Sequence, residues 1–152
     1  MVSLTNKYDN LIIIKSLTKF FALPGLRIGY GICTNAELNK NIQRISPAWN
    51  INILAEIAAK AGLKDKDYIN KSRIYLNKEQ EYLFKNLEQI KQLKIYKPSV
   101  NFIFFKTLIN IDLKHELLRK NILIRSCSNY EGLDSSYYRI AVRTHEENCI
   151  FI

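Results

Sequence analysis

The sequence lacks a long apolar run: no hydrophobic stretch approaches the roughly 20 residues that a membrane-spanning helix needs. Its first residues, 1–7, contain no apolar stretch of the kind that a signal peptide carries. The three cysteines, Cys33, Cys127 and Cys149, are odd in number and have no CxxC spacing, which argues against a disulfide framework and a zinc site. We therefore expect a cytoplasmic protein with reduced thiols and no membrane partner.

Basic residues are in excess, but they form no block of five or six and no stripe with interleaved aromatics. The 23 Lys and Arg against 14 Asp and Glu give a net charge of +9, and the lysines mostly alternate with Asn, Glu and Asp. We expect no nucleic-acid partner, because this pattern is that of a solvated surface; it also suits a small anionic ligand. We expect no metal site, since His115 and His145 have no ligand spacing.

The composition is otherwise that of a globular protein. With 152 residues, 47% hydrophobic and 11% aromatic, the chain can bury a core, and disorder is excluded. The isoleucine-rich run 10–16 is typical of a strand buried on both faces of a parallel sheet. Pro24 and Gly25 mark a turn, and glycines in the next strand suggest close approach of another backbone or a ligand. We expect strands at 10–16, 27–33, 93–97, 101–106, 122–125 and 137–143, and helices at 35–45, 50–61 (stopped at Gly62), 65–90, 112–119 and from 144 onward.

Strands and helices together predict an α/β fold. The first strand is of the buried type, yet it begins at Asn10 with no earlier strand to pair with. The last helix, opened by the capping-box pattern of Thr144 and Glu147, has little more than two turns before the sequence stops. We interpret the sequence as a piece of a larger α/β protein.

Lys19 has the clearest chemical setting. It follows a predicted strand, it is flanked by the hydroxyls of Ser16 and Thr18, and Arg27 comes eight residues later. Hydroxyls and a guanidinium hold phosphate, and nearby cations favour a neutral, nucleophilic lysine that can bind an aldehyde covalently. A phosphorylated aldehyde cofactor is one possibility for this segment, and a surface lysine beside a turn is another.

The segment S-x-T-K followed by P-G-L-R-I-G-Y, within 16–30, resembles the lysine segment of fold-type I, class I and II aminotransferases, which use pyridoxal 5′-phosphate (PLP). The resemblance implies that Lys19 is the catalytic lysine that binds PLP, and that Ser16 and Arg27, with help from Thr18, bind its phosphate. Residues 47–52 resemble the family's P-W-N-x-N segment with an extra alanine, and 99–102 resemble a strand start of histidinol-phosphate aminotransferases. The implied fold is the C-terminal part of a fold-type I PLP-dependent transferase.

A second group of candidates lies near the C-terminus. Residues 138–143 resemble the family's R-I-x-x strand, which assigns bidentate binding of the substrate α-carboxylate to Arg139; a solvated edge-strand arginine is the alternative. The run I-R-x-C-x-N-Y-x-G-L-D, at 124–134, is similar to threonine-phosphate decarboxylases of cobalamin biosynthesis, relatives of the histidinol-phosphate aminotransferases. Substrates of both carry a phosphate ester, which by resemblance Arg125 and Arg143 receive, although Arg143 also directly precedes a helix start.

The resemblance divides the chain into C-terminal elements of a large PLP-binding domain (1–46), linker helices (47–91) and a truncated small α/β domain (92–152). Family members are homodimers more than twice as long, and the N-terminal half that completes the site is absent here. We expect a decarboxylase of L-threonine O-3-phosphate, a small anionic amino-acid phosphate, with the chain alone binding PLP weakly and turning over poorly. The alternatives are a histidinol-phosphate-type aminotransferase and a non-catalytic fragment whose exposed sheet edges self-associate.

Overall fold

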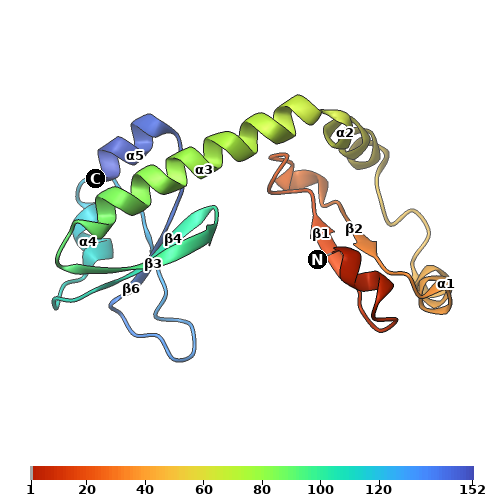
Figure 1. Cartoon of the computed structure of the whole chain (residues 1–152), viewed down its shortest axis with the longest axis horizontal. Helices are drawn as coiled ribbons and strands as arrows, with labels where there is room; N and C mark the ends of the chain where they lie inside the picture. Colours follow the sequence, from red (N-terminus) through yellow and green to blue (C-terminus); the bar gives the residue numbers. More distant parts are fainter. Residues whose placement is uncertain (1) are drawn as a thin grey trace. The chain divides into compact units, whose positions relative to one another are not determined.

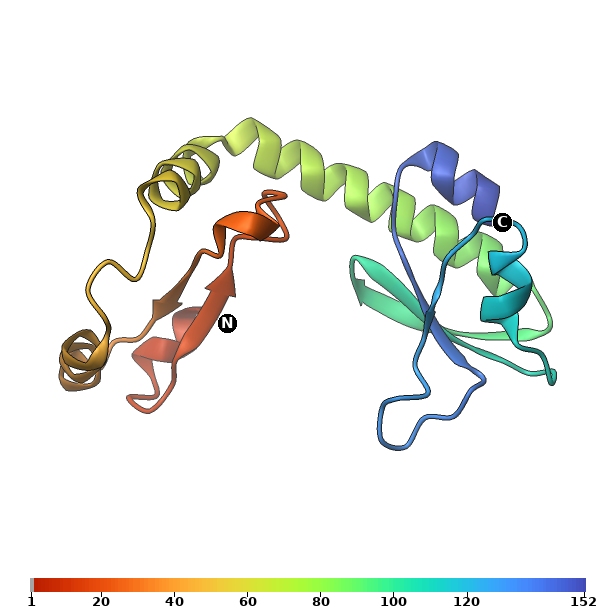
Figure 2. The same cartoon turned by 180° about the vertical axis from the view of Figure 1, so that it is seen from behind.

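The computed structural model describes residues 2–152 and divides them into two compact units, one ending at Tyr68 and the other spanning Ile69–Ile152 (Figures 1 and 2). The boundary falls within α3 (Lys66–Glu88), so the predicted three-part division remains a prediction. None of the helices in residues 2–152 has the length and apolarity needed to cross a membrane. Each unit combines helices with a sheet of its own, in agreement with the predicted α/β fold.

The first unit is built around a pair of strands, β1 (Ile13–Ser16) and β2 (Gly29–Ile32). Its core lies just beyond them, where Leu17 and Ile28 pack on Ala55 and Ala59 of the second helix. The small alanines allow this helix to come close to the chain that leaves β1. The remaining elements of the unit are the 3₁₀ turns η1 (Val2–Asn6) and η2 (Pro24–Leu26) and the helices α1 (Ala36–Ile45) and α2 (Ile53–Lys64).

The prediction that the first strand is buried on both faces of a parallel sheet is wrong for the residues described. β1 runs antiparallel to β2, its one partner among the described strands, and the side chain of Ile14 is 82% exposed. A two-stranded pair without a covering layer leaves both faces open. The apolar sequence of β1 therefore does not by itself show that both faces of the strand are covered.

The second unit contains a four-stranded antiparallel sheet in the order β3-β4-β6-β5. Alternate residues of β4 point into the core, where Ile103 and Phe105 pack on Leu83 and Leu87 of α3. The last helix, α5, lies alongside α3 in both views (Figures 1 and 2). The elements after α3 are β3 (Leu93–Val100), β4 (Phe102–Thr107), α4 (Leu113–Leu118), β5 (Arg125–Ser126), β6 (Tyr137–Ala141) and α5 (His145–Phe151).

The strand predicted at 122–125 is reduced to the two residues of β5. Residues 121 and 122 instead complete the end of α4: Asn121 has a φ of 62°, and the backbone N–H of Ile122 donates to the carbonyl of Leu117 at 2.9 Å. This left-handed arrangement satisfies the last carbonyls of a helix. Pairing with β6 begins only at Arg125, after that requirement has been met.

The sequence predicts that the second helix stops at Gly62, but α2 continues to Lys64. A Cβ atom at Gly62 would lie 2.9 Å from Cδ1 of Phe21, so glycine is needed there for close packing against the ring. The helix ends at Lys64, and the backbone N–H of the following residue, Asp65, donates to the carbonyls of Ala61 and Gly62.

The predicted capping box at the start of α5 is confirmed. Thr144 Oγ1 accepts from the backbone N–H of Glu147, and Glu147 Oε2 accepts from the backbone N–H of Thr144 at 3.2 Å. Arg143 Nε donates to Glu147 Oε1 at 2.8 Å. The hydrogen bond from Arg143, together with those from Thr144, lowers the pKa of Glu147 to about 2.

Replacing Ile103 with valine tests the core of the second unit. Ile103 is 0% exposed, and removing one methyl group from such a site typically costs about 0.5–1.5 kcal/mol of unfolding free energy. The control Ile74→Val changes a position on α3 that is 70% exposed, and it should cost less than about 0.5 kcal/mol. Urea unfolding followed by circular dichroism compares the two variants, and equal effects would contradict this core.

Glu147 should make the stability of α5 depend on acidity. Its folded pKa of about 2 lies below the ordinary value of 4.5, so the ionised carboxylate stabilises the fold above about pH 4.5. That contribution is lost as the pH falls from about 4.5 toward about 2. Glu147→Gln should reduce the pH dependence of the unfolding midpoint over this range, whereas Glu146→Gln, at an exposed neighbouring position, should not. Thermal unfolding at stepped pH measures both, and an unchanged acid limb in Glu147→Gln would disprove the assignment.

Candidate functional site

Three of the predicted cofactor residues are joined by hydrogen bonds at the end of β1. The hydroxyls of Ser16 and Thr18 lie 2.8 Å apart, and Lys19 Nζ donates to Ser16 Oγ at 3.4 Å. Thr18 is buried, whereas Ser16 and Lys19 are exposed. The three groups thus form a row of hydrogen bonds that runs from the buried hydroxyl of Thr18 through Ser16 to the exposed amine of Lys19.

Arg27 lies on the neighbouring segment rather than in contact with this row. The backbone N–H of Leu17 donates to the carbonyl of Ile28 at 3.1 Å, so the chain around Arg27 runs beside the chain around Ser16. Arg27 itself has a φ of 53°, and its guanidinium donates to the carbonyl of Pro24 at 3.0 Å. A non-glycine residue with this backbone is strained, and such strain is often found at binding sites.

Gly29 explains how the two segments come so close. A Cβ atom there would lie 2.6 Å from the carbonyl oxygen of Lys15. The prediction that glycine in this strand allows the close approach of another backbone is therefore confirmed.

The chemistry of these residues fits a phosphorylated aldehyde. Residues 10–36 contain no Asp or Glu, so no carboxylate within this stretch of sequence offsets the charges of Lys15, Lys19 and Arg27. Hydroxyl groups and a guanidinium can hold a phosphate, and the exposed amine of Lys19 is accessible to an aldehyde. The cofactor roles of these residues remain predictions.

Two of the predicted substrate arginines are direct neighbours in the second unit. Arg125 of β5 is paired with Arg139 of β6, and the Arg139 guanidinium lies 5.1 Å from the centroid of the Phe102 ring. Like charges at directly opposed positions repel each other. Both arginines act to lower the pKa of Cys127, although burial outweighs them and raises it. The pair forms an electropositive spot that an anion would stabilise.

Arg143 lies beyond the end of β6, directly before the cap of α5. Its NH2 atom lies 2.6 Å from Glu147 Oε1, so the guanidinium is already paired. The two side chains also line a cavity of about 460 Å³ whose other walls are mostly apolar. An anion that approached Arg143 would meet the Glu147 carboxylate as well, and its predicted role in binding phosphate remains a prediction.

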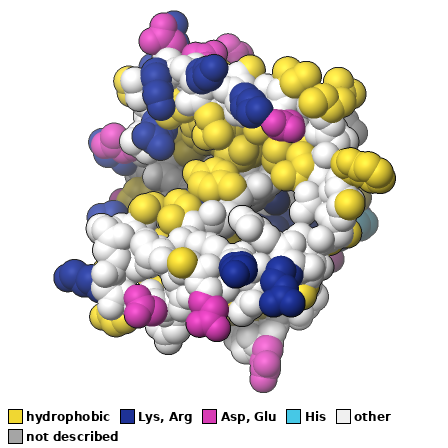
Figure 3. All heavy atoms as spheres, turned by 90° about the vertical axis from the view of Figure 1, so that its right-hand side faces the viewer, with side chains coloured by type: hydrophobic (Ala, Val, Ile, Leu, Met, Phe, Trp, Pro, Cys, Tyr) yellow, Lys and Arg dark blue, Asp and Glu magenta, His cyan; other side chains and the backbone are white. Residues whose placement is uncertain are grey.

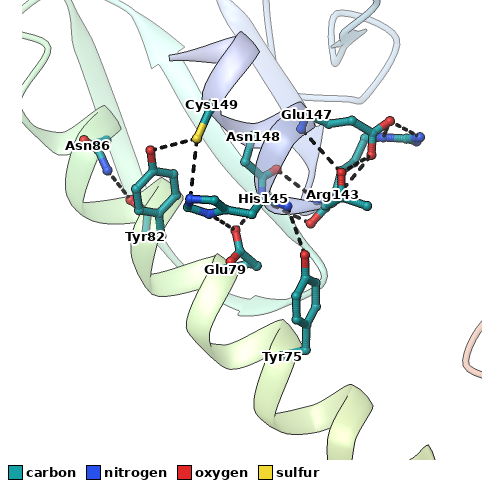
Figure 4. A network of polar contacts seen from close by, with 10 residues as sticks. Tyr75, Glu79, Tyr82, Asn86, Arg143, His145, Glu147, Asn148 and Cys149 are labelled. Carbon is teal, nitrogen blue, oxygen red and sulfur yellow. Dashed lines mark hydrogen bonds and ion pairs between the residues drawn. The ribbon is translucent and has the colours of Figure 1, made fainter.

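The sequence analysis missed a buried acid, Glu79, that is 1% exposed. Asn148 Nδ2 donates to its Oε2 at 2.9 Å, and His145 Nδ1 lies 3.1 Å from the same oxygen (Figure 4). One signal was available: Glu79 falls at four-residue spacing between Tyr75 and Leu83, on the apolar side of α3. No metal site accompanies it, since residues 2–152 hold no group of three or more His, Cys, Asp and Glu that could bind an ion.

Comparison with known proteins places this geometry in a family. A family model described as aminotransferase class I and II matches residues 2–152. Histidinol-phosphate aminotransferase of Methanococcus aeolicus is 35% identical over 149 residues, covering 96% of this chain and 40% of the relative. A protein named putative threonine-phosphate decarboxylase from Caldanaerobacter subterraneus subsp. tengcongensis is 37% identical over 151 residues, covering 98% and 41%.

The crystal structure of the histidinol-phosphate aminotransferase from Clostridium acetobutylicum superposes with a TM-score of 0.93 at 38% identity, over 99% of this chain and 46% of that one. The chain therefore spans less than half the length of the relatives it matches. Because the family model covers nearly every residue and the fold agrees with a solved member, the chain belongs to the class I and II aminotransferase family.

Proposed function

We propose that this chain provides the lysine and the substrate arginines of a PLP-dependent enzyme acting on an amino-acid phosphate, in the first instance L-threonine O-3-phosphate decarboxylase. The observation that carries the proposal is the row of Ser16, Thr18 and Lys19 beside the segment of Arg27. The relative named putative threonine-phosphate decarboxylase supports this reading. A histidinol-phosphate-type aminotransferase is the second candidate, supported by the relative of that name and by the solved structure.

PLP would be held by residues of the first unit. Lys19 would bind its aldehyde carbon through Nζ, and the hydroxyls of Ser16 and Thr18 with the Arg27 guanidinium would bind its phosphate. To do so, Arg27 would exchange its contact with the Pro24 carbonyl for charge-assisted bonds to phosphate oxygens. When bound, the cofactor supplies an electron sink for the substrate's Cα.

The substrate would be held by arginines of the second unit. Arg139 would bind the α-carboxylate with its two-pronged guanidinium, and Arg125, paired directly beside it, would receive the phosphate. A dianionic phosphate would relieve the repulsion between the two guanidiniums. Arg143 would take part only by giving up its ion pair with Glu147.

The proposed setting is a cytoplasmic homodimer that acts on a small anionic substrate and has neither a nucleic-acid nor a membrane partner. The three cysteines are free thiols, which suits a reducing compartment. Hydrophobic side chains gather at the surface in Figure 3, and on α2 Ile53, Leu54 and Ile57 are each more than half exposed. Apolar side chains in a row along one helix favour a partner surface.

Lys19 is tested by trapping the cofactor. The chain is mixed with PLP, reduced with borohydride and mapped by peptide mass spectrometry; the adduct should concentrate on Lys19. Lys19→Ala should lose the visible absorbance of the bound cofactor, whereas Lys15→Ala, at an exposed lysine of β1, the strand that precedes Lys19, should keep it. An adduct scattered over many surface lysines would refute the proposed cofactor site.

Arg139 is tested by substrate binding to the PLP-loaded chain, measured by calorimetry. Arg139→Lys should weaken L-threonine O-3-phosphate binding about tenfold or more, since hydrogen bonds to charged groups are worth about 1.5–3 kcal/mol. Arg119→Lys, in an exposed ion pair with Glu116, is the matched control and should bind normally. Release of CO2 in the same mixtures would favour the decarboxylase, and a keto acid formed with an amino acceptor would favour the aminotransferase.

A further inference from the structure

Cys149 on α5 is an exposed thiol held between two side chains that can act on it. Its Sγ lies 3.6 Å from Nε2 of His145 on the same helix and 3.3 Å from the hydroxyl of Tyr82 on α3 (Figure 4). The other two thiols are less accessible, since Cys33 is half-buried and Cys127 is buried. Cys149 is thus the one exposed cysteine among the three.

His145 is oriented by the buried carboxylate of Glu79. Its Nδ1 lies 3.1 Å from Glu79 Oε2, which also accepts from the amide of Asn148 at 2.9 Å. The hydrogen bond from Asn148 has the largest effect and lowers the pKa of Glu79. The bond with His145 also lowers it, and burial acts in the opposite direction. An ionised Glu79 accepts a hydrogen bond, so Nδ1 carries the proton and Nε2 is left facing the sulfur.

Tyr82 completes the arrangement from the other helix. Its ring packs on the imidazole of His145 with the centroids 4.8 Å apart, and this contact keeps both side chains in place. The hydrogen bond with Cys149 raises the pKa of Tyr82, so its hydroxyl stays protonated and can donate to sulfur. A thiol, an imidazole and a carboxylate are therefore aligned as in sites where a base activates a nucleophile, with one extra donor on the sulfur.

We propose that Cys149 is a reactive thiol that is modified by small disulfides, in a role separate from the PLP site. Its proton passes to Nε2 of His145, and the sulfur attacks one sulfur of the disulfide. A new S–S bond forms on Cys149 while the old one breaks, and the other half leaves as a thiolate that can take up the proton. Thiol and disulfide are exchanged one for one, so no further oxidant is needed.

A group attached to Sγ would occupy the space in which Tyr82 and His145 now meet the thiol. The effect would reach the start of α5, because the backbone N–H of His145 donates to the hydroxyl of Tyr75 at 2.9 Å. The modification would therefore act on the contact between α3 and α5.

The test uses the reduced chain and the disulfide 5,5′-dithiobis(2-nitrobenzoate), with the rate at each cysteine followed by peptide mass spectrometry. Cys149 should react fastest. His145→Gln should slow it about threefold to tenfold, because thiolate fraction and intrinsic nucleophilicity partly offset each other. Tyr82→Phe, which keeps the ring and removes the hydroxyl, should slow Cys149 as well.

Two controls separate activation from simple exposure. His115→Gln makes the same substitution at the other histidine, which is exposed on α4, and should leave all three rates unchanged. In each variant an unchanged rate at Cys33 and continued protection of Cys127 show that the fold is intact. If Cys149 reacts no faster than Cys33, or if its rate is the same in His145→Gln with the fold intact, the proposal is overturned.

Discussion

The contact between two backbone segments at Gly29 is the constraint on which the lysine site depends. Any side chain there would press on the carbonyl oxygen of Lys15, only 2.6 Å from where a Cβ would lie. With glycine in place, Ser16 pairs with Gly29 and the strand ends at a fixed point, three residues before Lys19. Arg27, two residues before Gly29, has a left-handed backbone with a φ of 53°. The same close packing thus determines the position of the amine and places strain on the proposed phosphate ligand.

The second unit depends on a buried charge rather than on a close backbone contact. Glu79 is almost fully removed from water, which is costly unless the carboxylate is paired. Asn148 and His145 supply partners from α5, so the position of that helix on α3 is specified by polar bonds as well as by apolar packing. Loss of one partner would leave Oε2 of this buried carboxylate with a single hydrogen bond. This explains why an asparagine that is itself 2% exposed occurs in a helix of seven residues.

Patterns of residues close together in the sequence predicted most helices and strands. The features that the sequence analysis missed depend on contacts between residues far apart in the sequence. Asn35, the first residue of the helix predicted at 35–45, caps α1, and Thr144 caps α5 as expected; a cap depends on residues three positions apart. The Lys19 segment was recognisable for the same reason, since its parts lie within 15 residues. The exposure of β1 depends on which strands pair with it, and the sequence of the strand does not contain this information. The bond between Glu79 and Asn148 joins residues 69 positions apart, and only the docking of α5 on α3 creates it.

For the proposed sites, the placement of the carboxylates matters more than the net charge of +9 itself. Lysines are spread along the whole chain, so their density does not mark a site. Four of the carboxylates elsewhere lie beside a cation three or four residues away, in the pairs Glu56–Lys60, Glu81–Lys85, Glu116–Arg119 and Glu147–Arg143. Residues 10–36 have no carboxylate at all, and Arg125 is paired with Arg139 rather than with an acid. Cations without a nearby carboxylate gain most from binding an anion, because no existing ion pair must first be broken. Residues 89–111 also lack Asp and Glu, so a lack of acids does not by itself distinguish these two places from that stretch. The absence of acids beside these cations therefore favours the proposed binding of phosphate and carboxylate groups at these two places.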